Sequence, residues 1–197
     1  MPDRPVKLIV GLGNPGPQHH SNRHNAGIIF LRNLCESYNG QLRGETKFFG
    51  EFGSININGT DIKLIFPTTF MNHSGKSVAA VCKFYKILPE NILVAYDEID
   101  FDVGVTRFKE GGGHGGHNGI RDIINAIGGN REFFRLRIGV GHPGHKSMVA
   151  DYVLSDPSRS ESSIIMSNIE DAVRVIPKAI EGHWEEAMRL LHSDRDK

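Results

Sequence analysis

The sequence is poor in cysteine and lacks any long apolar stretch. Its 197 residues include 2 cysteines, Cys35 and Cys82, and both fall within apolar patterns of helical spacing. A disulfide-stapled secreted protein needs more cysteines than this, so we expect two buried free thiols. The apolar run from Val6 to Leu12 is too short to span a membrane, and the N-terminus carries no signal-sequence core. These absences predict a cytoplasmic protein without a membrane partner.

A net charge is also lacking, because 23 basic residues balance 23 acidic ones. A polyanionic partner would therefore have to bind a local patch of the surface. Residues 105–146 carry seven basic residues against three acidic ones, whereas residues 151–197 carry ten acidic residues against six basic ones. The first segment either forms a basic face that binds phosphates or holds scattered, solvated charges.

Apolar runs of strand length alternate with patterns of helical spacing along the chain. Asn58-Gly59 separates two such runs, which is a strong signal for a hairpin. Ser74 is expected to cap the helix that follows it. The alternation predicts an α/β fold: one domain over residues 1–197, with three α/β/α layers and a mixed, mostly parallel twisted sheet flanked by helices. The main expected strands cover residues 7–11, 54–58, 62–66, 92–96, 105–108 and 134–140.

The C-terminal segment, from about residue 158 to 197, is expected to be helical. Ser158-x-x-Glu161 has the spacing of a capping box, in which each side chain bonds the backbone N–H of the other residue. Pro177 is expected to end or kink the helix that this box begins, because proline lacks the N–H of the helical hydrogen bond. A last helix is expected over residues 184–191. The sequence does not say whether this segment is a lid or only packs on the domain.

The glycines of Gly11-x-Gly13-x-x-Gly16 match a dinucleotide-binding pattern in number and spacing. That pattern works when a helix opens at the loop and directs its N–H groups at a pyrophosphate. Pro15 and Pro17 remove backbone donors here, and the residues that follow carry no apolar helix face. An acidic residue at the end of a strand about twenty residues further on is also missing. We therefore expect no nucleotide cofactor.

The ten histidines raise the question of a metal site. Three pairs have spacings that a metal ion could use, but zinc needs three or four ligands, and two of the pairs lie in glycine-rich loops. No metal site is expected. The three pairs are His20 with His24, His114 with His117, and His142 with His145.

His24 differs from the other histidines because it lies where an irregular loop meets the first helix. Asp97 follows a buried strand, at the end of an open α/β sheet where ligand crevices form. A carboxylate paired with an imidazole fixes its tautomer and suits it to be a general base. From spacing alone, this interpretation and a structural one, in which Asp97 caps a turn and His24 begins a helix, have equal weight.

A nucleophilic side chain is not evident. The sequence has no Gly-x-Ser-x-Gly motif, and both cysteines lie in the middle of expected helices. A hydrolase with this sequence would use water activated by His24. The residues alone leave three alternatives open: a nicotinamide-dependent enzyme based on residues 11–16, a metallohydrolase, and an RNA-binding module without catalysis.

Six segments, spread in order over nearly the whole chain, resemble bacterial peptidyl-tRNA hydrolase. They are VGLGNPG at 10–16, RHNAG at 23–27, PTTFMNHSG at 67–75, DEID at 97–100, GGGHGGHNG at 111–119 and RLRIGVGHPG at 135–144. The resemblance implies an enzyme that cleaves the ester between a peptide and the 3′ ribose of tRNA. Since nothing in the sequence suggests an obligate interface, we expect a monomer, and the failed nucleotide and metal interpretations predict that it needs no cofactor. The resemblance further implies that His24 is the base, that Asp97 keeps it ready to accept a proton, and that Asn14 helps to distinguish a blocked from a free α-amino group.

The resemblance also implies residues that bind the substrate. Phe70, Asn72 and Asn118 match positions that contact the tRNA end and the peptide. From the residues alone, core packing would be the preferred interpretation of Phe70 and Met71.

The same resemblance assigns phosphate-binding residues. Lys109 and Arg137 would clamp the tRNA 5′ phosphate, with Lys146 nearby. His19 stands where the family usually has tyrosine; it can still stack and hydrogen-bond, but it is smaller and can carry charge near pH 6.5.

Overall fold

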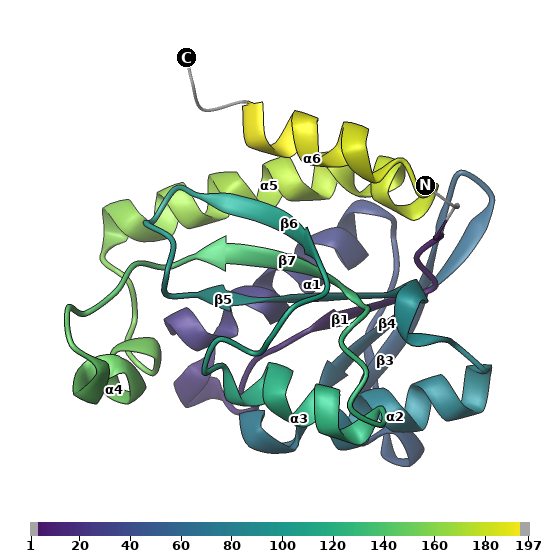
Figure 1. Ribbon diagram of the computed structural model, residues 1–197, viewed down its shortest axis with the longest axis horizontal. Coiled ribbons are helices and arrows are strands. Elements are labelled where there is room, and N and C mark those ends of the chain that lie inside the picture. Colours follow the sequence, from purple (N-terminus) through teal and green to yellow (C-terminus); the bar gives the residue numbers. More distant parts are fainter. Residues whose placement is uncertain (1–3, 194–197) are drawn as a thin grey trace.

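A mixed sheet of seven strands lies between two layers of helices in the computed structural model, which describes residues 4–193 (Figure 1). The strand order is β2-β3-β4-β1-β5-β7-β6. This arrangement confirms the predicted α/β fold. The strands are β1 Leu8–Gly11, β2 Arg43–Glu45, β3 Gly50–Ile57, β4 Thr60–Pro67, β5 Ile92–Glu98, β6 Thr106–Glu110 and β7 Phe134–Gly139. The helices are α1 Ala26–Ser37, α2 Ser74–Tyr85, α3 Asn118–Ala126, α4 Val149–Val153, α5 Arg159–Ile180 and α6 Trp184–Ser193.

The centre of the sheet is parallel. Strand β1 pairs in parallel with β4 and β5, and β5 pairs in parallel with β7. Strands β3 and β6 run antiparallel to their neighbours β4 and β7. The carboxyl ends of β4, β1, β5 and β7 therefore meet at one edge of the sheet, which is the edge where ligands bind in open α/β folds.

Each face of the sheet is covered by its own helices. Helices α1, α5 and α6 pack on one face and α2 and α3 on the other (Figure 1). Strand β5 is buried along its whole length. Leu93 and Ala95 belong to the hydrophobic cluster on the face covered by α1, and Val94 and Tyr96 belong to the cluster on the face covered by α2 and α3. This burial on both faces explains why β5 has a continuous apolar run in the sequence.

Two local predictions are confirmed. Asn58 and Gly59 both have positive φ, 51° and 86°, as the two central residues of a type I′ hairpin turn require. Ser158 and Glu161 form the capping box at the start of α5, because the Ser158 side chain accepts from the Glu161 N–H and the Glu161 side chain accepts from the Ser158 N–H.

One other local prediction, the capping of α2 by Ser74, is wrong. Ser74 does not cap α2 but is its first residue, and its hydroxyl donates to the Met71 carbonyl at 2.7 Å. Asp122 of α3 takes part in capping instead, since its carboxylate accepts from the Gly75 N–H at 2.7 Å.

Pro177 does not end α5, which continues to Ile180. Near the end of a helix, a proline removes one hydrogen bond while tertiary packing holds the rest of the turn.

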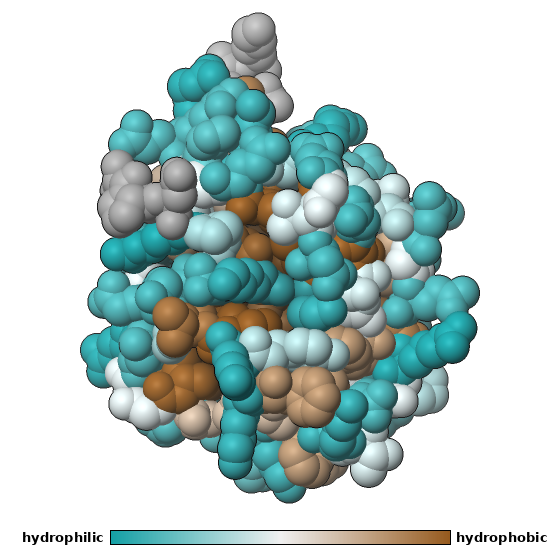
Figure 2. All heavy atoms as spheres, turned by 90° about the vertical axis from the view of Figure 1, so that its right-hand side faces the viewer, coloured by the Kyte–Doolittle hydropathy of each residue, from teal (hydrophilic) through white to brown (hydrophobic). Residues whose placement is uncertain are grey.

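The face that Figure 2 shows is mainly hydrophilic, with hydrophobic patches between the polar side chains. The exposed apolar side chains include Phe84 and Leu88 at the C-terminal end of α2. Within residues 4–193, no helix combines the length and the apolar character needed to cross a lipid bilayer.

Helix α1 lies directly on the strand backbone at Gly27. The Leu12 N–H donates to the Ala95 carbonyl at 3.1 Å, and the Ile28 N–H donates to the Leu12 carbonyl at 3.0 Å. A Cβ atom on Gly27 would lie 2.2 Å from the Ala95 carbonyl oxygen, which is backbone and cannot turn away. This close approach fixes the position of the turn that precedes α1.

We predict that Gly27→Ala lowers the free energy of unfolding by about 1–3 kcal/mol, the usual cost of overpacking a filled interior. Gly44→Ala is the matched control, because a Cβ at Gly44 meets no atom within 4 Å. Urea unfolding of both variants measures the difference. Equal stability of the two variants would contradict the close packing of α1.

Candidate active site

The Asp97 carboxylate lies at the carboxyl end of β5 and is bound by two imidazoles. Its side chain is 1% exposed. His24 Nδ1 lies 2.9 Å from each carboxylate oxygen, and His117 Nε2 lies 2.8 Å from Oδ1. The two rings have centroids 5.0 Å apart. Of the two interpretations open for His24 and Asp97, the geometry supports the paired one.

The hydrogen bonds define the tautomers of both histidines. An ionised carboxylate only accepts, so the His24 proton is on Nδ1, and Nε2 has a free lone pair. His117 Nδ1 accepts from the Ile120 N–H at 3.3 Å, so its proton is on Nε2 and is donated to Asp97. His24 thus has the tautomer that a general base needs.

Charge and burial act in opposite directions on this group. Burial by itself lowers the pKa of His24, but the charge of Asp97 and its hydrogen bond outweigh burial and raise that pKa above the ordinary value. Burial by itself raises the pKa of Asp97, but the charges and hydrogen bonds of His24 and His117 hold it well below the usual range. Asp97 is therefore ionised at neutral pH, and it favours the protonated form of His24.

The same three side chains are also of the types that bind metal ions, with ligand atoms within 4.8 Å of one another. Ligands of a tetrahedral zinc ion lie about 3.3 Å apart, given bonds of about 2.0–2.1 Å. The nitrogen–oxygen separations of 2.8–2.9 Å at Asp97 are instead those of charge-assisted hydrogen bonds. The donor set fits shared protons better than a shared ion.

Arg23 holds the short 3₁₀ turn Arg23–Asn25 that carries His24. Its side chain is 9% exposed, and Nη1 donates to the Ser155 hydroxyl at 2.6 Å and to the Asp156 carbonyl at 3.1 Å. The guanidinium also pairs with Glu161 and lies 4.0 Å from the Tyr152 ring centroid. The segment between α4 and α5 therefore fixes the turn on which His24 lies.

Asn14 lies at the carboxyl end of β1, beside the turn that carries His24. Its backbone N–H donates to Asn25 Oδ1 at 2.8 Å, and Asn25 Nδ2 donates to the Asn14 carbonyl at 3.0 Å. Asn14 Oδ1 accepts from the Met71 N–H at 2.9 Å. The amide is thus oriented by its oxygen, and its Nδ2 protons are left for a substrate.

The other expected substrate-binding residues lie at the surface around this edge. Phe70 is 69% exposed, whereas Met71 is buried, so core packing holds for Met71 and is wrong for Phe70. Asn72 is exposed in the 3₁₀ turn Met71–His73, and Asn118 is exposed at the start of α3, where Oδ1 accepts from Arg121.

His19 lies further along the loop after β1. It is partly exposed, and its Nδ1 accepts from Asn22 Nδ2 at 3.1 Å. Asn22 is itself held by the Leu154 carbonyl. The His19 ring is thus anchored on one side, and its Nε2–H is left for a ligand.

Four basic residues follow one face of the β6–β7 pair, and we call them the basic strip: Arg107, Lys109, Arg135 and Arg137. Arg107 is opposite Arg137 and Lys109 is opposite Arg135 in the strand register, so their side chains share a face. This strip lies on the face covered by α3, because Phe108 and Leu136 point into the core on the other face. Four basic residues of the segment are therefore gathered on one face of the sheet.

The members of the basic strip differ in how free their charges are. Lys109 is exposed, while Arg135 is buried and donates to the carbonyls of Gly112 and Gly113, which supports the glycine-rich loop. Arg137 Nε donates to Glu98 at 2.9 Å, so part of its charge is already paired. Lys146 is exposed in the 3₁₀ turn Lys146–Met148, outside the strip.

His117 is a site residue that the sequence reasoning missed. The sequence presents His117 only as one half of a possible metal-binding pair, because a histidine in a glycine-rich loop belongs to no periodic pattern. The available signal was its place directly before α3, where a side chain that accepts from the first turn is common.

Burial raises the pKa of the Cys82 thiol to about 11, so this cysteine is protonated at neutral pH, as its helical position predicts.

Comparison with known proteins gives consistent matches. The family model described as peptidyl-tRNA hydrolase matches residues 8–197. A peptidyl-tRNA hydrolase of Tolumonas auensis is 52% identical over 96% of this chain and 96% of its own length, and one of Pseudomonas aeruginosa is 49% identical over 96% and 98%. The crystal structure of the enzyme from Acinetobacter baumannii has a TM-score of 0.93 and 45% identity, covering 97% of this chain and 96% of that one.

We predict that Arg23→Met lowers the free energy of unfolding by about 3–5 kcal/mol, because it removes a buried charge and leaves its partners unpaired. Arg174→Met is the matched control, since Arg174 pairs with Asp171 at the surface and its side chain is 71% exposed. Urea unfolding measures both. If the two variants lose the same stability, Arg23 does not anchor the turn that carries His24.

Proposed function

Because this chain belongs to the peptidyl-tRNA hydrolase family, we propose that His24, oriented by Asp97, activates the water that attacks the ester of peptidyl-tRNA. The reaction is the hydrolysis of the bond between peptide and tRNA, which releases both and returns the tRNA to translation. The observation that carries the assignment of His24 is its 2.9 Å contact with a buried carboxylate, which fixes the tautomer with a free Nε2.

The proposed sequence of proton transfers uses only this pair. His24 Nε2 takes a proton from water as the water oxygen attacks the ester carbonyl carbon. The imidazolium that results is stabilised by the negative charge of Asp97, and it then gives its proton to the departing 3′ oxygen of the ribose. Asp97 stays ionised throughout, because its pKa lies well below the usual range.

His117 acts in this proposal as a positioning residue. It donates to the Asp97 oxygen that also contacts His24, and its own ring is fixed by the Ile120 N–H. This second hydrogen bond keeps the carboxylate ionised and limits its rotation. His117 thereby orients Asp97 without taking part in proton transfer.

The amides nearby are proposed to bind the peptide. Asn14 Nδ2 can donate to a carbonyl of the acyl group, which a blocked α-amino group has and a free one lacks. Asn72 and Asn118 can bind the peptide backbone or stabilise the oxyanion. The exposed ring of Phe70 offers a stacking surface for the end of the tRNA.

The basic residues are proposed to bind the tRNA backbone. Lys109 and Arg137, on the same face of the β6–β7 pair, would hold the 5′ phosphate, with Lys146 as a further contact. Arg137 would do so with the nitrogens that Glu98 leaves free. His19 would contact the RNA through Nε2.

The proposal treats residues 1–197 as one monomeric domain in the cytoplasm that works without a metal or nucleotide cofactor. A single sheet carries the residues assigned to catalysis at its one carboxyl edge, which supports the assignment of one domain. The loop between β1 and α1 holds only two single 3₁₀ turns, Pro17–His19 and Arg23–Asn25, in place of the longer helix that a dinucleotide-binding loop opens.

We predict that His24→Ala lowers kcat by about 10²–10⁴-fold, the usual contribution of a general base. Hydrolysis of a defined peptidyl-tRNA by the purified protein measures the loss, and tRNA binding is measured in parallel. EDTA is present throughout, since the proposal requires no metal. Full activity of His24→Ala would contradict the role of His24 as the base. Binding of tRNA without hydrolysis by the wild type would leave an RNA-binding module, and loss of wild-type activity in EDTA that zinc restores would indicate a metallohydrolase.

The dependence of kcat/KM on pH should change in Asp97→Asn. Because neutral His24 is the active form, activity rises with pH through the pKa of His24, which Asp97 raises. Removing the charge lets burial lower that pKa, so the acid limb moves to lower pH while the maximal rate falls. Asp100→Asn, an exposed neighbour, is the control and should keep the wild-type profile. An unmoved acid limb in Asp97→Asn would contradict the pairing.

Lys109→Ala should reduce the salt dependence of tRNA binding. Loss of one phosphate contact lowers the slope of log K against log salt concentration by about one unit. Lys83→Ala, an exposed lysine on α2 outside the basic strip, is the matched control. If the Lys109 and Lys83 variants have the same slope as wild type, Lys109 does not bind phosphate.

A further inference from the structure

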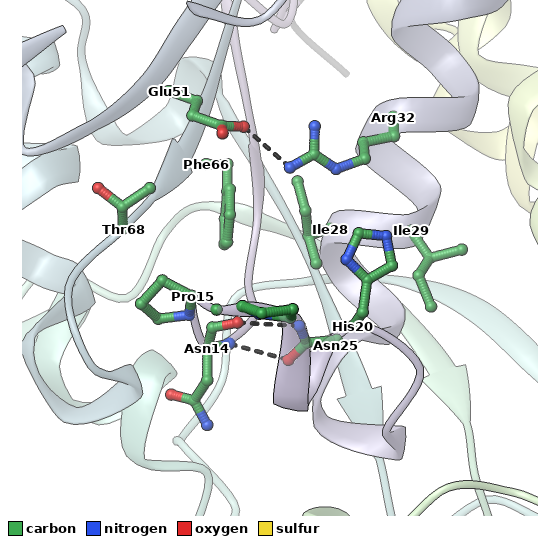
Figure 3. A pocket seen from close by; sticks show the side chains of 12 residues that line it. Asn14, Pro15, His20, Asn25, Ile28, Ile29, Arg32, Glu51, Phe66 and Thr68 are labelled. Atoms are coloured by element: carbon green, nitrogen blue, oxygen red, sulfur yellow. Dashed lines mark hydrogen bonds and ion pairs between the residues drawn. The ribbon is translucent and has the colours of Figure 1, made fainter. Parts of the chain in front are cut away.

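A pocket of about 330 Å³ opens between α1 and the β3–β4 hairpin, and its lining does not include His24, Asp97 or His117. We call it the α1 pocket. Its side walls include Ile28 and Ile29 of α1 and Phe66 of β4. In Figure 3 the Ile28 and Phe66 side chains face each other across it, and the ion pair between Arg32 and Glu51 spans its far end.

Asn14 joins this pocket to the catalytic residues. Asn14 lines the pocket, and its backbone is clamped in both directions by Asn25, the residue after His24. Its side chain points away from the Arg32–Glu51 pair and accepts from the Met71 N–H (Figure 3). One residue therefore borders both the α1 pocket and the proposed ester-binding position.

The strand order places the α1 pocket and the basic strip on opposite sides of the catalytic pair. The pocket lies beside β4 and β3, on the sheet face covered by α1. The basic strip lies on β7 and β6, on the other face. Strands β1 and β5, which lead to Asn14 and Asp97, lie between them. An ester held at His24 with its tRNA on the basic strip therefore directs its acyl side toward the α1 pocket.

The lining of the pocket suits an uncharged side chain. Ile28, Ile29 and Phe66 present hydrocarbon, and burying a leucine- or phenylalanine-sized group against them is favourable. Arg32 and Glu51 lie 2.9 Å apart and neutralise each other, and the Arg32 guanidinium lies 5.6 Å from the Phe66 ring centroid. A phosphate would find no free guanidinium at this position, so a nucleotide of the tRNA is the less suitable occupant.

From these observations we infer that the α1 pocket binds an apolar side chain of the peptide, close to its ester end, and so gives the enzyme a side-chain preference. The inference rests on the proposed function, because it needs the peptide to be attached to tRNA held at His24. Glu51 is a specificity-determining residue in this view: by neutralising Arg32, it prevents the pocket from attracting acidic side chains.

The test compares kcat/KM for N-acetyl-dipeptidyl-tRNAs that differ in one side chain, with leucine, glycine or glutamate at each of the two positions in turn. Wild type should prefer leucine to glycine by about 10-fold at one position, which is the size of a modest apolar contact. Glu51→Gln removes the charge that neutralises Arg32. The ratio of kcat/KM for the glutamate substrate to kcat/KM for the glycine substrate at that position should therefore rise by about 10-fold. Glu36→Gln is the matched control, because Glu36 is exposed on α1, the helix that carries Arg32, and does not line this pocket.

The outcomes separate this inference from the proposed function. If wild type hydrolyses all these substrates equally well, or if Glu51→Gln changes every rate by the same factor, the α1 pocket does not select a peptide side chain. A uniform change would instead indicate that the pocket holds the tRNA end that all substrates share. If wild type hydrolyses none of them, the proposed function fails and this inference fails with it. Thermal unfolding of Glu51→Gln checks that the variant is folded.

Discussion

One buried carboxylate constrains the arrangement of this protein more than any other group. Asp97 lies at the end of a strand that is buried on both faces, and an unpaired charge there would cost several kcal/mol. Two imidazoles compensate that cost, His24 from the turn before α1 and His117 from the start of α3. Since α1 and α3 cover opposite faces of the sheet, the hydrogen bonds of one side chain connect both helical layers to the central strand. The same bonds keep Asp97 ionised and His24 basic, so the requirements of stability and of catalysis coincide.

The position of His24 depends on contacts outside the catalytic pair. Gly27 lets α1 approach the strand backbone, and Arg23 bonds the preceding turn to the segment after α4 and to Glu161 at the start of α5. Glu161 also completes the capping box of α5, and its bonds to Ser158 and Arg23 hold its pKa below the ordinary value. The C-terminal helical segment thus supports the turn that carries His24. This arrangement connects a helix far away in the sequence to the proposed catalytic geometry.

The substrate has two chemically different parts, and the sheet separates the surfaces that suit them. Basic side chains gather on β6 and β7, where RNA phosphates would bind, and the α1 pocket with its neutralised ion pair lies across β1 on the other face. The ester joins the two parts of the substrate, and the catalytic pair lies between the two surfaces. The parallel pairing of β1 and β5 in the middle of the sheet causes this separation. The loops that follow these two strands leave the sheet at the same edge, one on the side of β4 and the other on the side of β7.

The sequence by itself determined the features that depend on neighbouring residues. The apolar runs, the Asn58-Gly59 turn and the Ser158–Glu161 box predicted the strands, the hairpin and the start of α5, because periodicity and local hydrogen bonding encode them. The motifs also identified His24 and Asp97 as candidates. Only the tertiary structure decided whether these two meet, that His117 joins them, that Ser74 begins a helix without capping it, and that Arg137 is paired with Glu98. Each of these facts depends on strand register or on contacts between segments far apart in the chain, and no local pattern records such contacts.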